Sequence, residues 1–174
     1  LIIGIYLIAM IVGALLYPVV ARAASPRLTL VGAATLVGIG FLLFLPLHGT
    51  YVEVIVNMVV VGLGSGALVA ALPAAAASAA PATQTGVATG LTNSVKTVGG
   101  AIASCVFGIA LLHGATDAAG GTAGSFAGYV TVWIVCGVTA FASAVLLLFV
   151  PKQAFRDRPA EDAEAIAGAD LGGS

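Results

Sequence analysis

The sequence predicts an all-α membrane protein with five transmembrane helices, on the strength of its composition and its hydropathy pattern. Of the 174 residues, 60% are hydrophobic and only 7% are charged, and the mean hydropathy is +1.16. A soluble domain carries about 25% charged residues. Five long apolar runs divide the chain, and they lack the alternating ten-residue pattern of a membrane β-barrel.

The apolar runs cover residues 1–21, 28–47, 52–80, 86–112 and 128–150, and together they define a helical bundle over residues 1–150. Most exceed the roughly 20 residues that a helix needs to cross a bilayer. Pro73 should kink the third run or end its membrane part, with helix continuing toward the headgroups. The first run begins at Leu1 without a Met or a charged n-region. We therefore expect the carboxyl-terminal portion of a longer protein rather than a signal peptide.

Basic residues predict the orientation of the helices. Arg22 and Arg27 mark the first loop, and three more basic residues follow the last run, whereas the loops after the second and fourth runs contain none. Short loops rich in Lys and Arg stay on the cytoplasmic side, so the first loop and the tail should both be cytoplasmic. Residues 151–174 combine this basic patch with five acidic residues, a composition that predicts a disordered tail.

Lys96 is the only charged residue deep inside an apolar run. It lies about 15 Å along the fourth run, near the midplane of the hydrocarbon core. A cation there costs about 3 kcal/mol on insertion scales and usually faces a bundle interior or a water-filled path. We predict that Lys96 and Asn93, one turn away, line a polar pathway. A structural pair with an acid elsewhere in the protein is the alternative.

The Lys96 side of a helical wheel also holds Thr85, Thr89, Thr92 and Asn93, whereas Thr97 and Ser104 belong to a neighbouring stripe of small residues. We assign Thr89, Thr92, Asn93 and Lys96, together with Asn57 of the third run, to a substrate or ion pathway. The remaining arc should face lipid or a neighbouring helix. This apolar arc consists of Val87, Leu91, Val95, Val98, Ile102, Val106 and Ile109.

Seven glycines are predicted to mediate helix packing, because small residues let helices approach closely in lipid. They are Gly62, Gly64 and Gly66 in the third run and Gly86, Gly90, Gly99 and Gly100 in the fourth. The GxGxG pattern of the third run is not a nucleotide-binding fingerprint, because no βαβ unit surrounds it.

The sequence gives no support to enzyme chemistry. It contains no Ser/His/Asp set, no metal-ligand cluster and no Walker loop, so we expect neither a metal site nor a cofactor. A net charge of −1 provides no basic surface for nucleic acid.

The segment from Pro81 to Gly100, PATQTGVATGLTNSVKTVGG, resembles the penultimate conserved segment of drug:proton antiporters in the major facilitator superfamily. The match covers Pro81, Gly86, Ala88, Gly90, Asn93, Gly99 and Gly100, with Lys96 where those proteins usually have arginine. The first loop resembles the second copy of the superfamily's cytoplasmic loop motif. It keeps Arg22 and Arg27 but has Ala21 where aspartate is usual.

This resemblance implies a fold, a mechanism and a set of partners. The five helices would be the last five of a C-terminal six-helix bundle in a multi-pass cell-membrane protein, in particular of the fourteen-helix multidrug efflux branch. Alternating access would couple proton entry to drug exit. The implied partners are the lipid bilayer, a small-molecule substrate, protons and the remaining N-terminal helices, which would carry the proton-binding acid.

Two other functions stay open at this point. One is an importer of sugars or organic acids on the same scaffold. The other is a non-transporting membrane module, such as a truncated gene product or an assembly partner.

Overall fold

The structure is a computed structural model that describes residues 2–113 and 126–150, so the tail predicted to be disordered lies outside the described residues. The described residues form five long helices and one short 3₁₀ helix. These are α1 (Ile2–Ala23), α2 (Pro26–Leu43), α3 (Tyr51–Ala79), η1 (Ala82–Gln84), α4 (Thr85–His113) and α5 (Phe126–Phe149). Each of the five long helices is long and apolar enough to cross a membrane, which confirms the predicted fold class.

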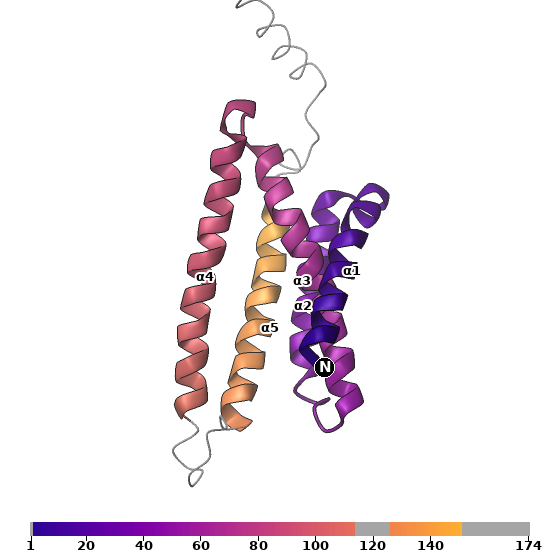
Figure 1. The fold of residues 1–174 in the computed structure, drawn as a ribbon, viewed down its shortest axis with the longest axis vertical. Coiled ribbons are helices and arrows are strands. Elements are labelled where there is room, and N and C mark those ends of the chain that lie inside the picture. The colour runs from indigo at the N-terminus through magenta and orange to yellow at the C-terminus, as the bar shows by residue number, and fades with distance from the viewer. Residues whose placement is uncertain (1, 114–125, 151–174) are drawn as a thin grey trace, which may run out of the picture.

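Helix α3 is the main packing partner of the first two helices. Both α1 and α2 pack along it, and α5 packs against α2. Helix α4 stands at the edge of the bundle beside α5, with only small contacts to α3 and α5 (Figure 1). The α1–α2 and α3–α4 connections lie at the same end of the bundle (Figure 1). Which side of the membrane this end faces stays a prediction.

Helix α2 ends at Leu43, earlier than the run of apolar residues predicts. Pro46 is the cause, because it has no N–H to donate to the Leu42 carbonyl, and the Leu45 N–H donates to that carbonyl instead at 3.1 Å. Pro73, in contrast, does not end α3, which continues for another turn and a half beyond it.

The N-terminus of α3 is capped by Glu53. Its carboxylate oxygen Oε2 accepts hydrogen bonds from the Gly49 N–H at 3.0 Å and from the Thr50 N–H at 3.1 Å. A carboxylate in this position satisfies backbone donors and interacts favourably with the positive end of the helix dipole. Glu53 is therefore part of the fold at the end of a helix.

Glycines of α3 bring its backbone against two neighbouring helices. Gly62 and Gly66, one turn apart, face α1: an added Cβ would lie 2.8 Å from the Tyr6 carbonyl oxygen at Gly62 and would overlap the Met10 carbonyl at Gly66. Gly64 faces α2, where an added Cβ would lie 2.7 Å from the Ala33 carbonyl oxygen. Because neighbouring backbone occupies these positions, no larger residue fits without moving a helix.

An aromatic cluster joins α5 to the end of α2 and the connection that follows it. Phe44 stacks on Trp133 with ring centroids 5.2 Å apart, and the His48 ring lies 5.0 Å from that of Phe126. Tyr129 is the fifth member, 6.4 Å from Trp133. Offset and tilted aromatic pairs of this kind add to packing beyond the area they bury. The cluster therefore holds α2 and α5 together at the end opposite the α1–α2 connection.

Asn57 is enclosed by the bundle of the described residues, and its assignment to a pathway stays a prediction. Its side chain is 0% exposed, and its Nδ2 donates to the Leu47 carbonyl at 2.8 Å, while Oδ1 has no partner among the described residues. A buried amide of this kind fastens α3 to the α2–α3 connection. Asn57 thus belongs to the fold rather than to the polar face of α4.

Replacing Asn57 by alanine should lower the free energy of unfolding of the intact protein by about 1–3 kcal/mol, because the partly buried Leu47 carbonyl loses its donor. Asn93→Ala is the matched control, since that amide is exposed and has no hydrogen bond to another described residue. Thermal unfolding of the detergent-solubilised variants measures both. Equal losses from the two substitutions would contradict the structural role of Asn57.

Candidate functional site

A cavity of about 520 Å³ lies between α3 and α4. The α3 wall is apolar, whereas α4 contributes the polar groups. The lining residues are Leu68, Val69, Leu72 and Pro73 of α3 and Leu91, Thr92, Asn93, Val95 and Lys96 of α4. Three of the five residues predicted to line a pathway therefore border one cavity, and Thr89 lies one turn before Thr92 on the same helix.

Lys96 lies eleven residues after the first residue of α4, which places its Cα about 16 Å along the helix axis. Its side chain is exposed, and no hydrogen bond or ion pair joins the Lys96 ammonium to another described residue. The only acid in the described part of the chain is Glu53, whose carboxylate caps α3. The site thus holds a cation at membrane depth with no counter-ion among the described residues.

The threonine hydroxyls on this face bond within their own helix. Thr89 and Thr92 each donate to the carbonyl four residues earlier, at 2.9 and 2.8 Å. Such bonds satisfy the hydroxyl donors where no water is at hand. The groups left to donate to a ligand are therefore the Lys96 ammonium and the Asn93 amide. Together with the apolar α3 wall, they suit an organic molecule with an apolar body and hydrogen-bond acceptors.

The apolar arc of α4, two members of which (Leu91 and Val95) also border the Lys96 cavity, is largely uncovered. Side chains of the apolar arc are 45–72% exposed, as expected for a surface that faces lipid or another helix. A Cβ added at any of the four predicted packing glycines of α4 would meet no atom within 4 Å. Gly99 borders a second cavity, of about 510 Å³, between α4 and α5. Unlike the glycines of α3, those of α4 do not pack against a helix in the described part of the chain.

Arg22 and Arg27 lie within helices rather than in a loop. Arg22 is in the last turn of α1 and Arg27 is the second residue of α2, separated by a tight corner in which Ser25 has a φ of 143°. The Arg27 guanidinium reaches α5, where Nε donates to the Leu147 carbonyl at 3.3 Å and Nη2 donates to the Leu148 carbonyl. These carbonyls lie at the negative end of α5, where the Val150 N–H also donates to the Leu147 carbonyl at 3.3 Å, so Arg27 caps that helix.

This cap could not be predicted from the sequence. Arg27 and Leu147 are 120 residues apart in the sequence. From the sequence alone, Arg27 is interpreted only as one more positive charge near a membrane surface. No local pattern marks a guanidinium that bonds to the end of another helix.

These features define a multi-pass helical membrane protein with a cationic, partly apolar cavity between two helices, an arrangement typical of proteins that move solutes across membranes. Residues 1–169 match the Major Facilitator Superfamily, and the chain belongs to that family. No match is found among the curated proteins, and none among the solved structures. The superfamily comprises secondary transporters rather than enzymes, so the superfamily-level expectation from the sequence is confirmed.

Proposed function

We propose that this chain is part of a proton-coupled transporter that exports drugs or other small organic molecules from the cell by alternating access. The observation that carries the proposal is the cation Lys96, which borders a cavity between α3 and α4 and has no partner among the described residues. Charged residues at this depth are costly and usually mark a substrate or ion pathway. The segment that holds Lys96 also resembles the drug:proton antiporters of the superfamily, which favours efflux over import.

Proton coupling requires a group that takes up and releases protons. Glu53 is engaged in capping α3, so it is not available for this role among the described residues. We propose that the proton-carrying acid lies on the remaining N-terminal helices of the protein. In alternating access two helical bundles rock around a central cavity. The side of α4 that carries the four uncovered glycines would then contact the other bundle. Lys96 and Asn93 would lie beside this contact between the bundles.

The orientation belongs to the same proposal. We place the α1–α2 connection and the tail on the cytoplasmic side of the cell membrane, because the basic residues gather there.

The test is transport by the intact protein in proteoliposomes. A fluorescent lipophilic amine is added together with an imposed pH gradient, and a pH-sensitive dye follows proton movement in the same vesicles. We expect gradient-driven movement of the amine and, without a gradient, proton movement that follows addition of the amine. The controls are vesicles without the protein, which report passive movement of the amine along the pH gradient, and vesicles treated with a proton ionophore. Uptake of a sugar or organic acid in place of the amine would favour an importer, and no transport of any of these would favour a non-transporting module.

A further inference from the structure

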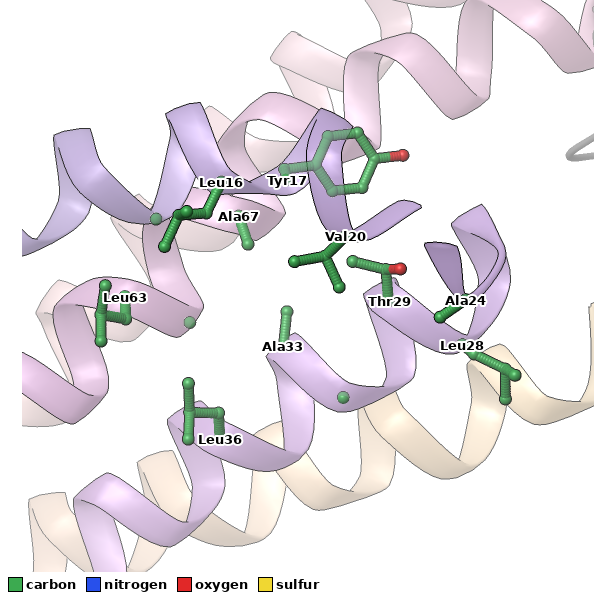
Figure 2. A pocket seen from close by; sticks show the side chains of 13 residues that line it. Leu16, Tyr17, Val20, Ala24, Leu28, Thr29, Ala33, Leu36, Leu63 and Ala67 are labelled. Carbon is green, nitrogen blue, oxygen red and sulfur yellow. The ribbon is translucent and has the colours of Figure 1, made fainter. Parts of the chain in front are cut away.

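A separate apolar groove of about 360 Å³ lies between α1 and α2, away from the Lys96 cavity. Although a two-residue corner joins these helices, they touch each other little and pack on α3 instead. The walls are residues 13–24 and 28–36, and the floor is formed by Leu63, Gly64 and Ala67 of α3 (Figure 2). Small residues at the floor and at Gly32 and Ala33 leave the hollow open.

Among the residues that line the groove, only Tyr17 and Thr29 have polar side chains. The hydroxyl of Thr29 donates to the Ser25 carbonyl at 2.8 Å. Tyr17 stands at the edge, and its hydroxyl points toward the end of the groove where Ala24 and Leu28 lie (Figure 2). Tyrosines commonly take this position at a membrane interface, with the ring in the apolar layer and the hydroxyl near the headgroups. The groove therefore has an apolar interior and a polar end.

The length of the groove fits one leaflet of a bilayer. Residues 28–36 of α2 span about 12 Å of helix axis, and residues 13–24 of the other wall about 16 Å. Half of a hydrocarbon core is about 15 Å thick. A lipid chain that enters at the corner end would therefore lie along the groove within its own leaflet.

The corner end of the groove is positively charged. Arg22 is exposed there, two residues before Ala24 of the wall, and Arg27 follows Ser25 at the same corner. Glu53 is the only acid among the described residues, and it caps the other end of α3, so none of these residues neutralises the two arginines. Arg27 bonds to the end of α5, whereas no hydrogen bond or ion pair joins the Arg22 guanidinium to another described residue. Basic residues at this depth attract anionic headgroups.

We propose that this groove is a binding site for an anionic phospholipid, with one acyl chain between α1 and α2 and the phosphate beside Arg22. The small residues of the groove give the acyl chain its space, and the arginine selects the charge of the headgroup. The site is distinct from the transport cavity, so it does not depend on the proposed transport activity.

Binding is measured on the intact, delipidated protein in detergent by native mass spectrometry, with phosphatidylglycerol and phosphatidylcholine of identical acyl chains. We expect one retained phosphatidylglycerol, favoured over phosphatidylcholine by about fivefold for the single arginine. Gly32→Leu fills the groove, since a Cβ there meets no atom within 4 Å, and it should reduce retention of both lipids at least fivefold. Arg22→Gln should abolish only the preference for phosphatidylglycerol.

Gly4→Leu is the matched control, because Gly4 is an equally open helical glycine of α1 outside the groove. Equal retention of the two lipids by the unmodified protein, or equal retention by the Gly32→Leu and Gly4→Leu proteins, would overturn the proposal. A photo-reactive residue in place of Leu28 identifies the occupant directly. A lipid adduct is expected, whereas a cross-link to another helix or to a second copy of the protein would show that protein fills the groove.

Discussion

Replacing Lys96 by alanine should reduce transport by the intact protein roughly 10- to 100-fold while leaving its thermal stability nearly unchanged. The ammonium has no partner among the described residues, so its loss strands no counter-ion there and relieves the cost of holding a charge at membrane depth. A hydrogen bond from a charged donor to a ligand contributes about 1.5–3 kcal/mol, which corresponds to this loss of transport. Initial rates in proteoliposomes and unfolding midpoints in detergent measure the two effects.

Ser94→Ala is the matched control, because Ser94 is an exposed residue of α4 whose hydroxyl donates to the Gly90 carbonyl of its own helix. It should transport normally. If Lys96 instead pairs with an acid elsewhere in the protein, Lys96→Ala should cost about 3–5 kcal/mol of stability, since a buried charge is left alone. Full transport by a stable Lys96→Ala protein would contradict a pathway role.

The arginine variant separates two ways in which Lys96 could act. Desolvated lysine can lose its proton, whereas arginine stays charged. Lys96→Arg should therefore keep its activity if only the positive charge matters, and the resemblance to antiporters with arginine at this position favours that result. Loss of transport in a stable Lys96→Arg protein would indicate that deprotonation is part of the cycle.

The largest loss of stability is expected from Gly66→Ala in α3. The added methyl group would overlap the Met10 carbonyl of α1, so the two helices must separate along a contact that Gly62 and Gly13 also make closely. Overpacking of this kind typically costs about 1–3 kcal/mol of stability. We expect a loss near the upper end of this range, because the opposing atoms belong to the backbone of α1 and cannot rotate away as a side chain can. Thermal unfolding of the intact protein in detergent measures the loss.

Gly4→Ala serves as the control for helix propensity, because its Cβ would meet no atom within 4 Å. It should leave stability unchanged or raise it slightly. A Gly66→Ala protein as stable as the Gly4→Ala protein would mean that α1 and α3 do not approach as closely as described.

Gly90→Ala distinguishes whether another part of the protein covers α4. Within the described chain this substitution meets open space and should be as harmless as Gly4→Ala. A loss of stability or transport in the intact protein would place a helix against this glycine, as the proposed second bundle requires. The stability and transport of the Gly90→Ala protein therefore test whether another helix contacts α4, and they do not test the fold of the described helices.

The helices themselves could be predicted from the sequence because their formation in lipid is a local matter. A helix satisfies its backbone hydrogen bonds within one segment, so hydropathy and length identify each span without knowledge of its neighbours. The polar side of α4 was predictable for the same reason, since Thr92, Asn93 and Lys96 share a helical face and border one cavity. Even the early end of α2 has a local cause in Pro46.

Tertiary structure alone decided which surfaces meet. The glycine patterns of α3 and α4 look alike in sequence. Within the part of the chain that the structure describes, however, backbone of a neighbouring helix approaches Gly62, Gly64 and Gly66 of α3 and none of the four predicted packing glycines of α4. Asn57 and Arg27 are likewise ordinary polar residues in the sequence. In the fold the bundle buries Asn57 of α3 against the Leu47 carbonyl, and α5 presents its terminal carbonyls to Arg27. The physical reason is that these contacts join separate elements of the fold, and a periodic pattern specifies a face without specifying its partner.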